Sequence, residues 1–215
     1  EALLLVKSVA AKSNSELGCL EKNIAVTIID ACESLLKDED LITHFPVDVF
    51  QTGSGTSSNM NANEVIATIA TKIADVKVDP NDHVNFGQSS NDVIPTTIHI
   101  SAAMTCTNTL LPALNHLIYT IEKKADDVKG YCKTGRTHLM DAMPVRLDQT
   151  LLGWASQVKN DVKIIENILP TVQNLALGGT AVGTGINTHP DFSKLCSGYL
   201  SKRTGLVFKP ADNFF

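Results

Sequence analysis

The sequence predicts a mainly all-α protein, and three observations support this fold class. Apolar residues recur at three- and four-residue spacing over most of the chain, which is the period of an amphipathic helix. Two of these segments are long enough to be the extended helices of a bundle. No strand-rich region interrupts the pattern. With 215 residues, of which 43% are apolar, the chain can bury a substantial core.

Two helices are predicted near the N-terminus. The first covers about residues 2–20 and has no capping residue before it, so we expect the start of the chain to be truncated. The second covers residues 24–37 and ends at a run of charged residues. A polar loop follows at residues 50–59, and Asn59 or Asn61 is the expected cap of the next helix.

The middle of the chain predicts two long helices. Pro95 fits the first turn of a helix that continues to about Asp127, with a kink at Pro112. At about 1.5 Å per residue this helix would be roughly 50 Å long. The other long helix covers residues 146–169. Such helices cannot bury their apolar faces in a compact monomer, so we expect a bundle shared between subunits. Short strands or hairpins are expected at residues 76–85 and 134–145.

Composition excludes several classes of function. The formal net charge is −5, from 18 basic and 23 acidic residues, whereas binding to nucleic acid or an anionic membrane requires a basic face. No apolar run approaches the ~18–20 residues of a membrane span. The five cysteines are scattered and no pair has C-x-x-C spacing, so we expect no metal site and small buried thiols in a reducing compartment. The cytoplasm is the expected location, or the mitochondrion if the host is eukaryotic.

Three polar clusters are the candidates for chemistry, at residues 52–59, 88–91 and 135–138. The first two place hydroxyl and amide side chains at predicted helix N-termini, where backbone N–H groups and the helix dipole bind anions. Neither ends in the Gly-Lys-Ser/Thr of a phosphate loop, so a small carboxylate fits better than a nucleotide. Each loop alone is better explained as a helix cap, and a lone His138 is more often structural than catalytic. Function rests on the three clusters occurring together.

Six segments of the chain, in order, resemble the N-terminal part of class II fumarases, in the fumarase/aspartase superfamily. The matching segments are residues 51–56, 59–65, 80–85, 88–92, 135–139 and 178–190. The resemblance implies a mainly all-α fold, with an N-terminal lyase domain at residues 1–88 and the first part of a central helical bundle domain at residues 89–215. It also implies a homotetramer whose active sites combine loops of three subunits.

The resemblance implies a fumarate hydratase of the tricarboxylic acid cycle, a lyase that adds water reversibly and anti to fumarate, giving L-malate. The dicarboxylate would be its only small-molecule partner, without metal or organic cofactor. The substrate-binding residues implied are Ser54, Gly55, Thr56, Ser89, Ser90, Asn91 and Thr137. Residues 89–91 would come from a second subunit and residues 137–138 from a third. His138 would be the catalytic proton donor or acceptor, working with bound water.

The family also has a second carboxylate site at a turn that matches Asp79, Pro80, Asn81 and Asp82. Its usual first residue is histidine. The negative charge of Asp79 is expected to weaken anion binding there.

Two alternatives stay open beside fumarate hydratase. One is an aspartate ammonia-lyase or other small-acid lyase on the same scaffold, although related aspartases usually have Gln in place of His138 and Thr in place of Ser90. The other is a non-catalytic helical assembly protein. The family's catalytic serine loop, Gly-Ser-Ser-x-Met-Pro-x-Lys-x-Asn, does not occur before Phe215. The 215 residues are therefore expected to be a fragment that is inactive alone.

Overall fold

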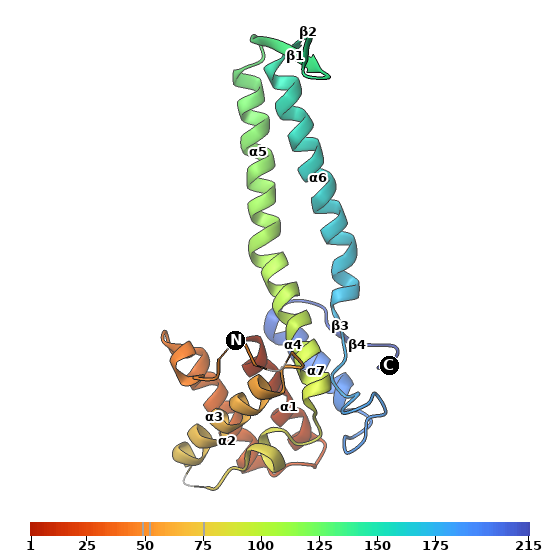
Figure 1. Ribbon diagram of the computed structural model, residues 1–215. Coiled ribbons are helices and arrows are strands. Elements are labelled where there is room, and N and C mark those ends of the chain that lie inside the picture. The colour runs from red at the N-terminus through yellow and green to blue at the C-terminus, as the bar shows by residue number, and fades with distance from the viewer. Residues whose placement is uncertain (49, 52, 75) are drawn as a thin grey trace. The chain divides into compact units, whose positions relative to one another are not determined.

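The computed structural model describes residues 1–48, 50–51, 53–74 and 76–215, and it is mainly helical (Figure 1). The predicted fold class is confirmed. The chain divides into two compact units, one made of Glu1–Ala103 with Thr171–Phe215 and the other of Met104–Pro170. The domain boundary between residues 88 and 89 stays a prediction, because it refers to the domains of a whole family subunit.

The first unit is built from helices and short turns. Its elements before the second unit are α1 (Ala2–Glu16), α2 (Lys22–Leu36), the 3-10 turn η1 (Leu41–His44), α3 (Thr56–Ala74), the π-helical turn η2 (Pro80–Val84) and α4 (Ser90–Thr105). After the second unit come β3 (Asn174–Leu175), α7 (Phe192–Thr204) and β4 (Lys209–Pro210). The two short strands pair in parallel. Both N-terminal helices were predicted at nearly these positions.

The core of the first unit lies between α1, α2 and α3. Its buried side chains include Leu4, Ala11, Ile24, Ile28, Ile66 and Ala70. These residues recur at helical spacing, so each helix turns one apolar face toward the other two. On the other side of α1, the Cys196 thiol of α7 donates a hydrogen bond to the Ser13 hydroxyl at 3.3 Å. The helix α1 is therefore covered by packed neighbours and forms the rigid base of this unit.

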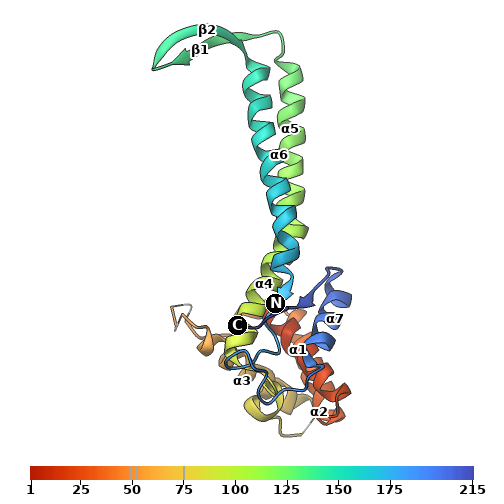
Figure 2. The ribbon, with the colours of Figure 1, turned by 90° about the vertical axis from the view of Figure 1, so that its right-hand side faces the viewer.

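The second unit is a pair of helices joined by a hairpin. It contains the π-helical turn η3 (Cys106–Leu110), α5 (Leu111–Asp127), the strands β1 (Cys132–Thr137) and β2 (Met140–Arg146), and α6 (Leu147–Val172). Helices α5 and α6 lie side by side in both ribbon views, with the hairpin at one end (Figure 2). The Lys159 ammonium of α6 donates to the Glu122 carboxylate of α5 at 2.5 Å. The hairpin covers residues 132–146 and includes the predicted segment 134–145.

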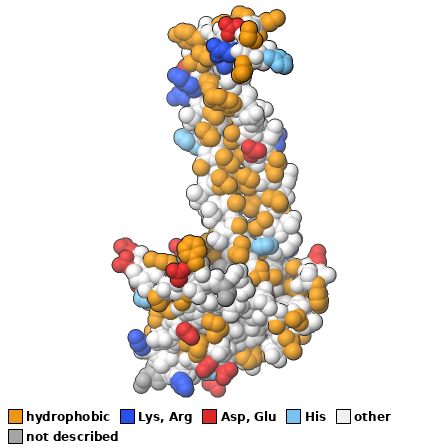
Figure 3. Space-filling model, in the orientation of Figure 1, with side chains coloured by type: hydrophobic (Ala, Val, Ile, Leu, Met, Phe, Trp, Pro, Cys, Tyr) orange, Lys and Arg blue, Asp and Glu red, His pale blue; other side chains and the backbone are white. Residues whose placement is uncertain are grey.

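Many apolar side chains of α5 and α6 stay exposed. The exposed group includes Leu117, Tyr119, Leu152, Trp154, Ile164 and Ile168. Figure 3 shows hydrophobic side chains spread along this helix pair. With 26 residues, α6 is about 39 Å long at 1.5 Å per residue, and only one stripe of it meets α5. A pair of long helices cannot cover all of its own apolar surface, as the sequence predicted.

Three local expectations were wrong. Residues 76–85 contain no strand in their described part, because the Asp79 carboxylate accepts the N–H groups of Asn81 and Asp82 and winds the chain into η2. The helix α3 begins at Thr56, so neither Asn59 nor Asn61 is its cap. The Asn59 side chain bonds to neighbouring segments instead.

The third wrong expectation concerns the start of α4. This helix begins at Ser90, which places Pro95 in the second turn rather than the first. The reason is a capping pair at the N-terminus, formed by Ser89 and Asp92, that starts the helix early. Proline has no N–H, so Pro95 cannot donate to the carbonyl of Asn91 in the first turn.

Pro112 does not end the helical run, as predicted. The turn η3, which directly precedes α5 and its Pro112, is π-helical. A proline ring clashes with the carbonyl four residues earlier, here that of Asn108, and the wider π turn makes room for it. In the described part of the chain, none of the helices has the length and apolarity needed to cross a membrane.

The packing of α2 predicts a contrast between two positions on this helix. Ile28 is fully buried, whereas Val26 is 46% exposed. In the whole protein, Ile28→Ala should lower the free energy of unfolding by about 2–5 kcal/mol, because it leaves a cavity. The matched control Val26→Ala should change it by less than about 0.5–1 kcal/mol. Urea unfolding followed by circular dichroism measures both, and equal effects would contradict this core.

Candidate active site

The first polar cluster lies at the N-terminus of α3. The Ser54 and Thr56 hydroxyl oxygens are 3.1 Å apart, and both residues are exposed. Thr56 is the first residue of the helix, so the N–H groups of this first turn have no acceptor within the helix. Hydroxyl and N–H donors at the positive end of a helix dipole can bind a carboxylate. Thr52 lies outside the described residues.

Gly55 allows this cluster to approach α4. Its φ angle is +70°, which a residue with a side chain rarely adopts. A Cβ placed on Gly55 would lie 2.8 Å from the Ile94 side chain of α4. Both the backbone conformation and the contact with Ile94 therefore require glycine at this position.

The second polar cluster caps α4. The Ser89 N–H donates to the Asp92 carboxylate at 2.9 Å, and the Asn91 N–H donates to the Ser89 hydroxyl at 3.3 Å. This reciprocal pair is a capping box. The Ser90 hydroxyl accepts from the Asn59 amide at 3.0 Å. The Asn91 amide donates to the carbonyl of Ala181 at 2.8 Å, which ties the loop to residues 178–185.

The structure brings these two clusters together within one chain. Asn59 of α3 bonds to Ser90 at the start of α4, and Gly55 lies against Ile94. The helices α3 and α4 start side by side, and both N-termini are held by the same contacts. The expectation that residues 54–56 and 89–91 act together from two subunits stays a prediction.

A buried carboxylate joins the second cluster to residues 178–185, the glycine-rich segment. Asp92, 2% exposed, accepts the N–H groups of Gly178 at 3.0 Å and Thr180 at 2.9 Å, as well as that of Ser89. Burial raises the pKa of Asp92, and the three N–H donors act in the opposite direction. The φ angle of Thr180 is +57°, a strained conformation for a β-branched residue. Asp92 therefore compensates local strain with hydrogen bonds.

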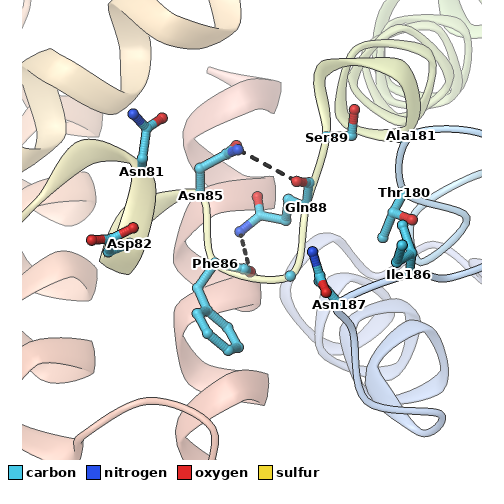
Figure 4. A pocket seen from close by; sticks show the side chains of 11 residues that line it. Asn81, Asp82, Asn85, Phe86, Gln88, Ser89, Thr180, Ala181, Ile186 and Asn187 are labelled. Carbon is cyan, nitrogen blue, oxygen red and sulfur yellow. Dashed lines mark hydrogen bonds between the residues drawn. The ribbon is translucent and has the colours of Figure 1, made fainter.

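A cavity of about 540 Å³ opens beside this network (Figure 4). Its lining includes Asn81, Asp82, Asn85, Gln88, Ser89, Thr180 and Asn187. Most of these side chains are neutral donors or acceptors. One wall is the turn predicted as the second carboxylate site, and another is the loop with Ser89. The cavity is therefore large enough, and polar enough, for a small organic acid.

The turn at residues 79–82 already holds a carboxylate of its own. One oxygen of Asp79 accepts from the N–H groups of Asn81 at 2.8 Å and Asp82 at 2.9 Å. These two hydrogen bonds, that of Asp82 first, lower the pKa of Asp79. The Asp79 N–H donates to the ring Nδ1 of His83 at 2.9 Å. The donors that an external anion would need are thus occupied by this side chain.

The third polar cluster belongs to the second unit. Thr137 ends β1, and His138 with Leu139 forms the two-residue turn of the hairpin. The φ angles of these two turn residues are +50° and +62°, which suits a tight I′-type turn but is strained for residues other than Gly and Asn. The His138 side chain is exposed at the tip. Since this unit is described by itself, its His138 is not placed relative to the first two clusters.

The sequence predictions missed three residues that organise the site: Lys7, Asn59 and Asp92. Asp92 has a readable signal, because Ser89-x-x-Asp92 is a capping-box pattern. Lys7 interrupts an otherwise apolar run on α1, which could have marked it as a buried, functional charge. The role of Asn59 has no such signal, since it depends on tertiary contacts to residues 85 and 90. In the described residues, no group of three or more His, Cys, Asp or Glu side chains could hold a metal ion.

Comparisons with known proteins agree with this geometry. A family model described as Lyase matches residues 1–215. The chain is 60% identical to a class II fumarate hydratase of Pseudomonas aeruginosa, over 100% of this chain and 46% of the relative. It is 51% identical to a class II fumarate hydratase of Halobacterium salinarum, again over 100% and 46%. A crystal structure of class II fumarase from Schistosoma mansoni matches with a TM-score of 0.94 at 39% identity, covering 100% of this chain and 49% of that one.

The fold and the two helix-terminal clusters thus define a lyase scaffold, and the chain belongs to this lyase family. Within the family it is similar to class II fumarate hydratases. The chain spans about half the length of the relatives it matches.

Proposed function

We propose that the protein to which this chain belongs is a fumarate hydratase that interconverts fumarate and L-malate by anti addition and elimination of water. The observation that carries the proposal is the pair of adjoining helix N-termini, with Ser54, Thr56, Ser89, Ser90 and Asn91 presented around them. All are neutral donors, as recognition of a small dicarboxylate requires. The names of the similar proteins support the same substrate.

Elimination of water from malate removes a weakly acidic proton beside a carboxylate. The intermediate is an aci-carboxylate that carries two negative charges on one group. Hydroxyl and N–H donors held in place before the reaction bind this species more tightly than the ground state, and this difference lowers the barrier. In this proposal Thr56, Ser89 and Ser90 belong to that donor set, Gly55 allows its close packing, and Thr137 adds a donor.

His138 is proposed as the catalytic acid or base that exchanges a proton with bound water. Its ring is exposed on a strained two-residue turn. The strain is consistent with a functional position, because such turns usually use Asn-Gly or Asp-Gly instead. An exposed histidine can exchange protons with solvent between turnovers. The hairpin would present Thr137 and His138 to a site on another subunit.

The proposed assembly is a homotetramer with active sites shared between subunits. Support comes from the helix pair α5 and α6, which leaves large apolar side chains such as Trp154, 54% exposed, without cover in one chain. A bundle of such pairs from several copies would bury them. Location in the cytoplasm stays a prediction.

The second carboxylate site of the family is proposed to be closed in this protein. The Asp79 carboxylate takes the place of an external anion on the N–H groups of Asn81 and Asp82. Its negative charge also repels a dianion. Pro80 fixes the turn in which this occurs.

The first test is turnover by the whole protein. We expect L-malate to give fumarate, followed by ultraviolet absorbance, and L-aspartate to give no ammonia. Sedimentation of the same sample should give four times the subunit mass. Ammonia release without malate turnover would favour an aspartate lyase. If a folded tetramer turned over neither acid, the substrate proposal would be refuted.

His138→Asn tests the proton-transfer role. It should lower kcat by about 100- to 10,000-fold with little change in KM, because an acid–base group is lost while the carboxylate donors remain. The matched control is His116→Asn, an exposed histidine of α5 in the same unit, which should keep the wild-type rate. Equal rates for all three proteins would remove His138 from the mechanism.

Asp79→Ala tests the closed second site by isothermal titration with succinate, a dicarboxylate that cannot be hydrated. The unsubstituted protein should bind one succinate per subunit. The variant should bind a second, more weakly, because two N–H donors beside the cavity become free. The control Asp30→Ala, on the exposed face of α2, should again bind one. Two succinates per unsubstituted subunit would contradict the proposal.

A further inference from the structure

A lysine is buried beneath the loop that carries Ser89 and Ser90. Lys7 lies on α1 and has 0% exposure, the largest side chain in the fully buried set. An ammonium group removed from water is costly unless its donors are used. Its Nζ donates to Asn85 Oδ1 at 2.9 Å and to Gln88 Oε1 at 3.0 Å. Both acceptors are neutral amides, so these contacts are not ion pairs. The two hydrogen bonds instead fix the positions of the Asn85 and Gln88 side chains.

Asn85 and Gln88 are the two ends of a turn that leads into the segment of Ser89 and Ser90, here called the substrate loop. The Gln88 amide donates to the carbonyls of Val84 at 3.0 Å and Phe86 at 3.2 Å, which closes the turn on itself. Figure 4 shows the bond to Phe86. The Asn85 amide donates to the Gln88 carbonyl at 3.4 Å. A second residue of α1, Asn14, donates to the Phe86 carbonyl at 2.9 Å. The turn is therefore anchored to one rigid helix at several points.

A short chain of hydrogen bonds continues from Lys7 to the substrate loop. Asn85 Oδ1, which accepts from Lys7, also accepts from the Asn59 amide at 3.3 Å. The same Asn59 amide donates to the Ser90 hydroxyl at 3.0 Å. The Ser90 hydroxyl oxygen accepts this hydrogen bond, so the hydroxyl proton stays available for donation. It could therefore donate to a substrate carboxylate.

We propose that Lys7 is a positioning residue for the hydratase reaction, whose buried ammonium fixes the Asn85–Gln88 turn and thereby orients the Ser89 and Ser90 hydroxyl groups toward the substrate carboxylate. This inference rests on the proposed function. Lys7 does not touch the substrate; it acts through Asn85, Asn59 and the turn.

Because the charge of Lys7 changes with pH, its role can be tested through the pH dependence of substrate binding. Burial lowers the pKa of Lys7 from its ordinary value to about 7, and Asp92 of α4 and Cys32 of α2 act in the opposite direction. The groups from α3 and the turn that face it, Asn59, Asn85 and Gln88, do not titrate. Above this pKa the neutral amine still donates two hydrogen bonds, but the positive charge beneath the loop is lost. Binding of a dianion should therefore weaken as the pH rises through about 7.

The test compares Lys7→Met with the unsubstituted whole protein in L-malate turnover. Methionine is of similar length and is well tolerated in a core, but it donates no hydrogen bond. We expect kcat/KM to fall at least tenfold, through a higher KM and a lower kcat, because Ser89 and Ser90 hold the substrate carboxylate and bind the aci-carboxylate still more tightly. The rise of KM around pH 7 should disappear in the variant. The matched control Lys12→Met, an exposed lysine of the same helix, should keep both the rate and the pH profile.

A double-mutant cycle separates positioning from general stability. If Lys7 acts through Ser90, the losses in Lys7→Met and Ser90→Ala should not add in the double variant, whereas a merely structural effect would add. If Lys7→Met does not assemble, Gln88→Met removes one acceptor only and should raise KM at least threefold.

The outcomes are distinct. A folded Lys7→Met variant, or its Gln88→Met substitute, with unchanged KM and pH profile overturns the role of Lys7 while the proposed function stands. Additive losses in the cycle also overturn it. If the unsubstituted protein does not turn over malate, the proposed function is refuted, and so is the role of Lys7 in that reaction.

Discussion

The Asp92 carboxylate holds three N–H groups that come from two distant parts of the chain, the start of α4 and the glycine-rich segment after α6. An ionised carboxylate in a buried place is costly, and each charge-assisted hydrogen bond offsets part of that cost. The arrangement fixes where α4 begins and keeps Thr180 in a strained conformation. Much of the candidate site follows, because the helix start and the cavity wall are placed by the same side chain.

Buried polar groups organise this site more than the apolar core does. The core of α1, α2 and α3 supplies a rigid base, but it would accept many loop conformations above it. Lys7 and Asn59 select one of them by hydrogen bonds to neutral amides. Each such group would be expensive if left unpaired, so the loop can move only by breaking several bonds together. The proposed function requires such preorganisation, because its intermediate is highly charged.

The second unit has two features that the first unit does not explain. Its helices are amphipathic but expose broad apolar surfaces, and its hairpin ends in a strained turn that carries His138. Within one chain neither feature is compensated. Both become reasonable if the unit is completed by other copies, which would cover the helices and receive the turn. In the proposed function, the first unit would supply fixed donors and the second would offer His138 to a neighbouring subunit.

The sequence by itself determined the helical class, the positions of the N-terminal and long helices, and the polar clusters, because periodicity and cap residues are local properties. It predicted a turn at Asp79, but it did not place the start of α3 or α4. The start of α3 is accompanied by the contact of Gly55 with Ile94, which lies far along the chain, whereas the start of α4 follows from the local Ser89–Asp92 capping pair. Only the tertiary structure decided that Lys7, Asn59 and Asp92 converge beneath one loop, because burial turns ordinary polar residues into obligatory hydrogen-bonding partners.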